Sequence, residues 1–187
     1  GNLWWRRGGE IPPTPRIMGV PQYADGQLLI PMTSVESYLA GNVEQICCRF
    51  RGSLVSLNPA SGQQNWKHFT VPQPQQTGTN SKGVATFRPS GATIWSAPSY
   101  DLNTRRAYVG TGANYSHAAT ATSDAILAVD IDTNQLAWSY QGLAGDAWNM
   151  SCGTADPFNC PANNGPDYDF GSSPILTSLS DGRRVLL

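Results

Sequence analysis

Two matching segments of this sequence constrain its fold more than any other feature. The first runs from Ser53 to Trp66, and the second runs from Ala125 to Trp138, 72 residues later and without a gap in the alignment. Each has an apolar run typical of a buried strand, then turn-forming residues, and then a tryptophan on the returning strand. The pair predicts two similar β-hairpins.

A second repeated unit precedes these hairpins along the chain. Its prolines, Pro21, Pro98 and Pro174, lie 77 and then 76 residues apart, and each leads into an apolar run. One period therefore holds two hairpins, or four antiparallel strands, which is the make-up of a β-propeller blade. We expect an all-β chain of about two and a half four-stranded blades.

Residues 1–187 are expected to form one partial β-propeller domain, with blade repeats beginning near residues 20, 97 and 173 and no separate second domain. A propeller closes with about four to eight blades, because each blade buries its faces against two neighbours. The chain is therefore expected to be a fragment of a larger propeller. A two-sheet sandwich built from the same strands is the alternative fold.

Composition favours the all-β class and excludes several functions. Only three glutamates and two lysines occur, and helix surfaces use these residues most. Charged residues make up 13% of the chain and the formal net charge is −1, which argues against a nucleic-acid partner. No apolar run approaches the roughly 20 residues of a membrane span.

The tryptophan hairpins resemble the docking repeats of quinoprotein propellers, the dehydrogenases that use pyrroloquinoline quinone (PQQ). Further motifs resemble the polyvinyl-alcohol branch of that family, and together they cover nearly the whole chain: Cys47–Gly52, Trp95–Pro98, Gly110–Ser116 and Gly145–Asn149, followed by Cys152 and Cys160. The resemblance implies an eight-bladed quinoprotein-type propeller. It also implies that this fragment alone is inactive.

A quinone dehydrogenase needs a flat apolar face for the cofactor ring. The resemblance assigns that face to Trp95 and a further cofactor contact to Thr93. From its position alone, a tryptophan at a strand start more often packs between blades. The adjacent Cys47 and Cys48 resemble the vicinal disulfide that lies against the quinone in alcohol-oxidising relatives. They sit next to the Phe50–Gly52 strand, on a different blade from the one used in the small-alcohol enzymes, so contact with the cofactor is left open.

The reaction also needs a cation to polarise a carbonyl, and the resemblance implies calcium, which prefers oxygen ligands. Glu36 matches the family's glutamate ligand, with a solvated loop acid as the alternative. The family's asparagine ligand falls on Ala113, and Asn114 follows one residue later. Either Asn114 replaces the ligand or the ligand is lost, because a shift of one residue in an extended segment reverses the side chain's direction.

The proton acceptor is the least direct assignment. The position of the catalytic aspartate in small-alcohol relatives is Asn149 here, and an amide does not accept a proton at neutral pH. Asp146 lies three residues earlier and is our predicted base. A turn-forming aspartate is its alternative role.

The remaining cysteines and one polar segment bear on location and substrate. Cys152 and Cys160 lie in a loop with little core of its own, which favours a structural disulfide. An even number of cysteines in two pairs favours an oxidising compartment, so we expect a secreted or periplasmic protein. The polar segment from Pro72 to Ser81 either borders the substrate groove or is exposed loop.

Two functions follow from the resemblance. The first is PQQ-dependent oxidation of a secondary or polymeric alcohol, with calcium as Lewis acid and electrons passing to an external acceptor such as cytochrome c. The second is a non-catalytic propeller that acts as a binding or assembly scaffold. A scaffold has no need for Trp95, Glu36 and the Cys47–Cys48 pair together, so the enzyme is favoured.

Overall fold

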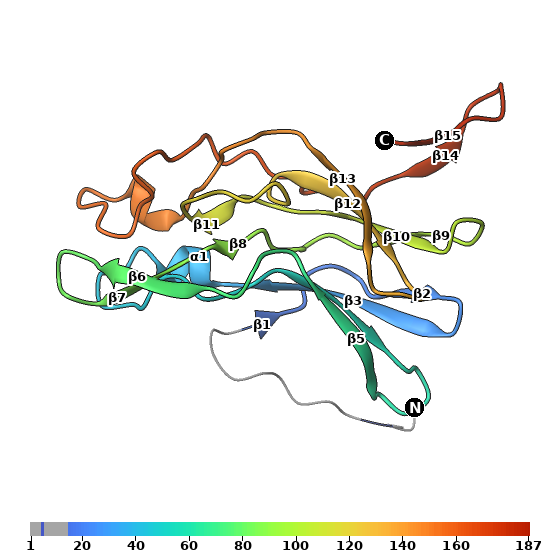
Figure 1. The fold of residues 1–187 in the computed structure, drawn as a ribbon, viewed down its shortest axis with the longest axis horizontal. Coiled ribbons are helices and arrows are strands. Elements are labelled where there is room, and N and C mark those ends of the chain that lie inside the picture. Colours follow the sequence, from blue (N-terminus) through green and yellow to red (C-terminus); the bar gives the residue numbers. More distant parts are fainter. Residues whose placement is uncertain (1–4, 6–14) are drawn as a thin grey trace.

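The computed structural model describes residue 5 and residues 15–187, and it is mostly β structure in small antiparallel sheets (Figure 1). The first large sheet contains β2 (Gln22–Ala24), β3 (Gln27–Ser34), β4 (Ser53–Leu57) and β5 (Gln64–Phe69), and β1 (Pro15–Arg16) pairs with the far end of β3. The second contains β9 (Ser99–Asp101), β10 (Arg106–Gly110), β12 (Ala125–Asp130) and β13 (Leu136–Gln141). Both are four-stranded meanders of the predicted kind, which confirms the all-β class.

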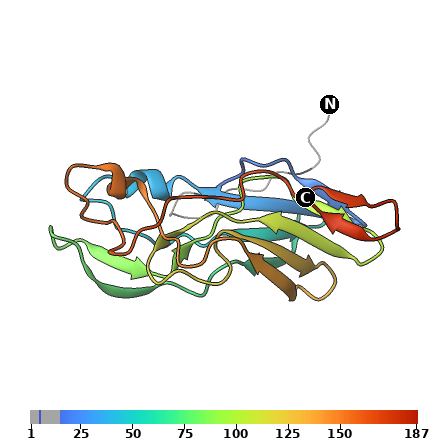
Figure 2. The same ribbon diagram turned by 90° about the horizontal axis from the view of Figure 1, so that it is seen from above.

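The remaining elements are short. One pair of strands, β14 (Leu176–Ser178) and β15 (Arg184–Leu186), follows the third repeated proline. The hairpin of β6 (Gln75–Thr79) and β7 (Ala85–Arg88) lies at the opposite end of the molecule (Figures 1 and 2). Between these ends, β8 (Ser90–Gly91) pairs with β11 (Asn114–Ser116), and two single-turn helices, α1 (Glu36–Leu39) and η1 (Met150–Gly153), lie near the β6–β7 end.

The core lies between the two large sheets. Alternate residues of β12, namely Ala125, Leu127 and Val129, are fully buried, as the two-residue period of a strand requires. They belong to one apolar cluster with residues of the first sheet, which include Leu29 and Leu54. Each sheet therefore buries one face against the other, as neighbouring blades of a propeller do.

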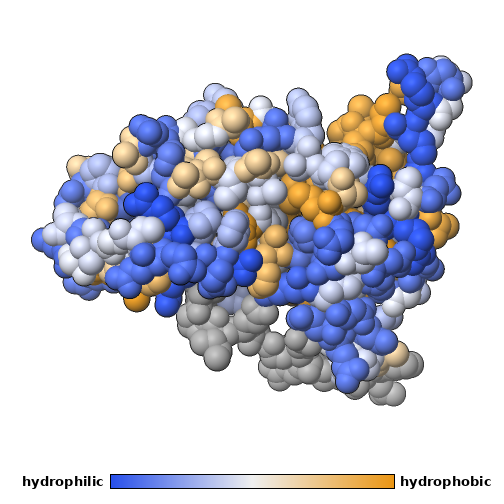
Figure 3. Space-filling view, viewed as in Figure 1, coloured by the Kyte–Doolittle hydropathy of each residue, from blue (hydrophilic) through white to orange (hydrophobic). Residues whose placement is uncertain are grey.

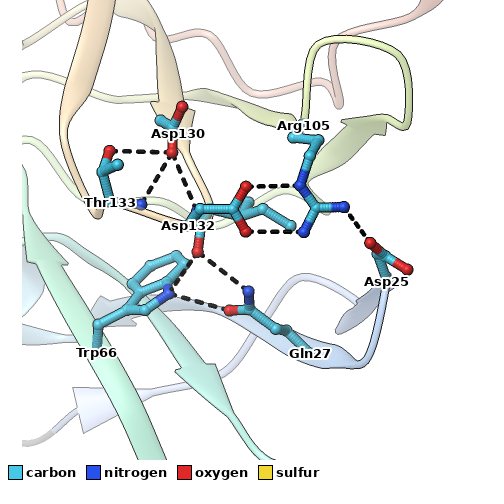
Figure 4. Close-up of polar contacts among 8 residues, drawn as sticks. Asp25, Gln27, Trp66, Arg105, Asp130, Asp132 and Thr133 are labelled. Carbon is cyan, nitrogen blue, oxygen red and sulfur yellow. Dashed lines mark hydrogen bonds and ion pairs between the residues drawn. The ribbon is translucent and has the colours of Figure 1, made fainter.

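A tryptophan of the first blade makes a hydrogen bond to the second. The Trp66 indole N–H lies 2.9 Å from the carbonyl oxygen of Ile131 and 3.0 Å from Oε1 of Gln27 (Figure 4). Gln27 Nε2 donates to the same carbonyl at 3.0 Å. One indole thus joins the returning strand of the first blade to the turn that follows β12.

An exposed ion-pair network spans the same junction. The Arg105 guanidinium donates to both oxygens of Asp132 and to Asp25 of the first blade (Figure 4). These side chains are 38–47% exposed, so water screens their attraction. The indole contact is half-buried and is expected to contribute more to the junction.

The tryptophan of the second hairpin, Trp138, has different surroundings from Trp66. The Trp138 ring packs against Tyr108, with centroids 5.8 Å apart. It borders a hollow of about 480 Å³ beside the β14–β15 hairpin, where Figure 3 shows apolar residues gathered. Within the described part of the chain, the Trp138 side chain is 37% exposed.

Replacing Trp66 by Phe should lower the free energy of unfolding by about 1–3 kcal/mol, because the Ile131 carbonyl and Gln27 lose a shared donor at a half-buried site. Urea unfolding of the full-length gene product measures this change. Arg105→Gln is the comparison, and it should cause a smaller loss that added salt removes. An equal or larger loss for Arg105→Gln would show that the ion pairs, and not the indole, hold the junction.

Candidate functional site

A cavity of about 190 Å³ lies beside the segment that joins β8 to β9. Its lining brings together the predicted Thr93 and Trp95 with residues from several elements: Met18, Thr33, Ser37, Gly112, Ala113, Tyr115, Trp148, Asp167 and Asp169. The cavity therefore combines two indole rings, several hydroxyl groups and two carboxyl groups.

The extended segment after β8 places Thr93 and Trp95 on the same side. Ile94, between them, is fully buried in the core, and its N–H donates to the Met32 carbonyl at 3.2 Å. Because alternate residues of an extended chain face opposite sides, the flanking threonine and tryptophan both face the cavity. The Thr93 carbonyl accepts from Gly112 N–H at 3.1 Å, which ties this segment to the opposite wall.

Gly171 packs directly against the Trp95 ring. A Cβ at this glycine would lie 2.7 Å from Cη2 of the indole, so a larger residue would push the ring. The indole is therefore held in place by backbone on this side, which suits a fixed platform for a flat ligand.

The two predicted calcium ligands are both buried and have hydrogen-bond partners. Glu36, 1% exposed, begins α1, and its oxygens accept from Arg49 N–H at 2.7 Å and Phe50 N–H at 2.6 Å. Burial raises the Glu36 pKa, while these amides and the Arg49 charge oppose the rise. Among the described residues, no three His, Cys, Asp or Glu side chains come close enough to hold a metal ion.

Asn114 faces away from the cavity, and its neighbour Ala113 lines it. The Asn114 side chain donates to the Ser90 carbonyl at 2.8 Å. Its amide oxygen accepts from the N–H of Thr120 at 2.6 Å and from the Thr120 hydroxyl at 3.1 Å. The shift of one residue thus turns the Asn114 side chain away from the cavity, and the assignment of Glu36 and Asn114 as calcium ligands stays a prediction.

Both predicted disulfides are present. The Cys47–Cys48 bridge is buried in a cluster with Ala40, Phe50 and Tyr115. Tyr115 also lines the cavity, whereas the two cysteines do not. The vicinal disulfide thus supports one wall of the cavity from behind.

The two predicted catalytic residues lie outside the lining. Asp146, 1% exposed, accepts from Tyr168 N–H at 3.2 Å. Asn149 caps η1, with its oxygen accepting from Ser151 N–H at 2.9 Å. Its Nδ2 donates to the carbonyls of Tyr115 at 2.8 Å and Asn159 at 2.9 Å. Both the oxygen and the nitrogen of the Asn149 amide therefore have backbone partners.

The carboxyl groups that line the cavity are Asp167 and Asp169, which the sequence reasoning missed. Asp169 accepts from Ala113 N–H at 2.7 Å. Burial and the charges of Asp169 and Asp146 raise the Asp167 pKa to about 6. The one available signal was an Asp-Tyr-Asp run after the second disulfide, without a spacing that ties it to Trp95.

A fourth aspartate extends this acidic group into the interior. Asp124 is 1% exposed and has a φ of 48°. Within the described part of the chain, no N–H or O–H group donates a well-formed hydrogen bond to either of its carboxyl oxygens. Burial, together with Asp146 and Asp169, raises its pKa to about 8, and the adjacent Ser123 hydroxyl opposes this weakly. We therefore expect Asp124 to be protonated at neutral pH, which the pH dependence of stability tests below.

Comparison with known proteins identifies the family to which the chain is similar. The model of the PQQ family, described as the β-propeller domain of glucose, ethanol and alcohol dehydrogenases, matches residues 33–158. Polyvinylalcohol dehydrogenase of Pseudomonas sp is 35% identical over 188 residues, which cover 100% of this chain and 29% of that protein. The Sphingopyxis sp. (strain 113P3) polyvinylalcohol dehydrogenase is 34% identical over 190 residues, with the same coverage. The chain thus spans 29% of the length of these relatives.

Solved structures show the same fold. Quinohemoprotein alcohol dehydrogenase from Comamonas testosteroni superposes with a TM-score of 0.58 at 22% identity, over 91% of this chain and 24% of that chain. The europium-containing methanol dehydrogenase gives a TM-score of 0.59 at 20% identity, over 92% and 29%. The described sheets are therefore part of a quinoprotein-type propeller, as predicted, and not a two-sheet sandwich.

Replacing Asp124 by Asn should flatten the dependence of stability on pH. The raised pKa stabilises the folded protein fully below the ordinary value of 3.8, and this stabilisation is lost as the pH rises through about 8. Urea unfolding at pH 4 to 9 measures the slope. The exposed Asp156 offers the control Asp156→Asn, which should keep the wild-type slope. A wild-type slope in Asp124→Asn would mean that Asp124 is ionised in the fold.

Proposed function

This chain belongs to the PQQ family of glucose, ethanol and alcohol dehydrogenase β-propellers, and on that premise we propose that its cavity is where the hydroxyl of a secondary alcohol is oxidised. One observation carries the proposal: Trp95 and Thr93 line the same cavity as two carboxyl groups. Both carboxyl groups reach solvent, and partial burial with the charges of Asp169 and Asp146 raises the Asp167 pKa, a property that a proton acceptor uses and a scaffold does not need.

The lining fits PQQ in chemical character. The Trp95 ring offers a flat face, and Thr33, Ser37 and Thr93 offer hydroxyl groups for the polar edge of a quinone. When bound, PQQ would accept the hydride from the alcohol carbon. The chain's own residues would orient the ring and the alcohol, and Gly171 would keep the indole in place from its other side.

The two predicted calcium ligands, Glu36 and Asn114, already have hydrogen-bond partners within the chain. The oxygens of Glu36 and Asn114 accept hydrogen bonds from backbone N–H groups, and the Asn114 side chain faces away from the cavity. Their assignment as calcium ligands stays a prediction, and no proton or substrate position is derived from it.

We assign the proton acceptor to Asp167 in place of Asp146. Asp167 lines the cavity and reaches solvent, so it can take the hydroxyl proton and return it to water. Its pKa of about 6 keeps it largely ionised at neutral pH and still basic enough to accept a proton. Asp146 is buried behind the lining, where its charge contributes to the raised pKa of Asp167.

The relatives' names suggest the substrate class, and the disulfides suggest the cellular compartment. Two of them are polyvinylalcohol dehydrogenases, so the proposed substrate is a secondary alcohol, polymeric or small, and the electrons would pass to an external acceptor such as a cytochrome c. The two disulfides support an oxidising compartment, and a secreted or periplasmic protein would meet a polymer there. In the described part of the chain, no helix is long and apolar enough to cross a membrane.

Asp167→Asn should lower kcat for a secondary alcohol by roughly 10²–10⁴-fold, because an amide cannot accept the proton. Dye reduction by the full-length gene product, supplied with PQQ and calcium, measures kcat, and quenching of tryptophan fluorescence by PQQ measures cofactor binding. Quenching should be retained in Asp167→Asn and lost in Trp95→Ala.

Asp146→Asn separates the two candidate bases. It should keep most of kcat and move the acid limb of the pH profile below about 6, because a charge that raises the Asp167 pKa is gone. A collapse of kcat in Asp146→Asn, with full activity in Asp167→Asn, would return the role to Asp146. Wild-type protein that neither binds PQQ nor reduces the dye would favour the scaffold.

A further inference from the structure

A second hollow, of about 320 Å³, is lined by Ser116 of β11, and the preceding residue, Tyr115, lines the cavity. The pairing of β11 with β8 shifts register between Asn114 and Ser116, the kind of irregularity that a β-bulge introduces. One wall is the β6–β7 hairpin, and the other is the loop from Phe158 to Ala162, which the Cys152–Cys160 disulfide closes. We call this hollow the hairpin groove.

The groove offers hydrogen-bonding groups with little charge. Arg88 is the one charged side chain among its described lining residues, and its Nε donates to the Thr77 hydroxyl at 2.9 Å. The Thr79 and Thr86 hydroxyls and the His117 ring line the groove, and in the described structure none of them has a hydrogen-bond partner. They are therefore available to a ligand. This differs from the cavity, where two carboxyl groups line the wall.

Apolar surface alternates with these groups. The Phe87 and Phe158 rings line the groove from opposite walls, and both are half-buried. The Arg49 guanidinium lies over the Phe87 ring, 5.7 Å from its centroid, so only the other face of that ring is offered to a ligand. Pro161 and Cys47 also line the groove, although both are buried. A matching ligand carries methylene and hydroxyl groups in alternation and carries no charge.

We propose that the hairpin groove binds a stretch of an uncharged polyhydroxylated chain while another hydroxyl of the same chain enters the cavity. The proposal rests on the proposed function for the reaction, and it adds the place where a polymeric substrate is held. Two observations favour a polymer over a separate small ligand. The groove and the cavity are lined by neighbouring residues of β11, and the described lining of the groove has no carboxyl group to act as a base.

Holding a second stretch of the same molecule raises the effective concentration of its hydroxyls at the cavity. The consequence is a selective one: the groove matters for a long chain and not for a short alcohol that reaches only the cavity. Loss of groove contacts should therefore raise KM for the polymer and leave kcat and the KM for a short alcohol unchanged.

Phe158→Ala and Thr86→Val test this separately in the full-length gene product. Phe158→Ala removes an aromatic face, and Thr86→Val removes one hydroxyl at nearly constant volume. Polyvinyl alcohol is the long probe, and pentane-2,4-diol is the short one. Each variant should raise the polymer KM by roughly fivefold to tenfold. Titration calorimetry with the polymer, without PQQ, should show the same loss of affinity.

Tyr23→Ala is the matched control, because Tyr23 is a 60% exposed aromatic residue on β2, at the other end of the molecule. It should leave both substrates unaffected. Unchanged polymer affinity in both groove variants, or an equal rise in KM for polymer and diol, would overturn the groove proposal. If the wild type binds polymer through the groove but oxidises neither probe, the proposed function fails and the groove stands.

Discussion

The packing of one four-stranded sheet on the next is the interaction on which the other features depend. The shared apolar cluster buries one face of each sheet, and Ile94 joins it from the segment between them. Burial of Ile94 determines which way Thr93 and Trp95 point, because neighbours in an extended chain face the other side. The direction of the platform residue is thus determined by the core of the propeller, and the backbone at Gly171 packs against its ring.

The acidic residues at the cavity oppose this stabilisation. Burial and the charges of Asp146 and Asp169 raise the pKa values of Asp124 and Asp167, and burial and Asp146 raise that of Asp169. A carboxylate is costly to bury without a partner, and none of the described salt bridges includes Asp124 or Asp146. A raised pKa at a carboxyl group beside an aromatic face is, however, what a proton acceptor at neutral pH needs. The cost to stability and the proposed chemistry therefore have the same origin.

The sequence was sufficient for the parts that repeat. The proline period and the two tryptophan hairpins predicted both four-stranded sheets, because strand alternation and turn residues are local signals. It was also sufficient to bring Thr93 and Trp95 to one cavity. It was not sufficient for Asp167, since about twenty residues without a regular period separate it from Asp146, and only tertiary packing returns the chain to the cavity. The direction of Asn114 followed from strand alternation, but its partner Thr120 lies in a loop whose path the sequence does not specify.

The amide at position 149 shows why the family's catalytic aspartate can be absent here. Its Nδ2 donates to the carbonyls of Tyr115 and Asn159, and its oxygen accepts from Ser151 N–H. A carboxylate could keep the last bond but could not donate to the two carbonyls. The amide therefore ties the loop after η1 to the strand that separates the cavity from the hairpin groove. The same loop continues to Asp167, the proposed proton acceptor, so the Asn149 amide helps to fix the loop that brings this carboxyl group to the cavity.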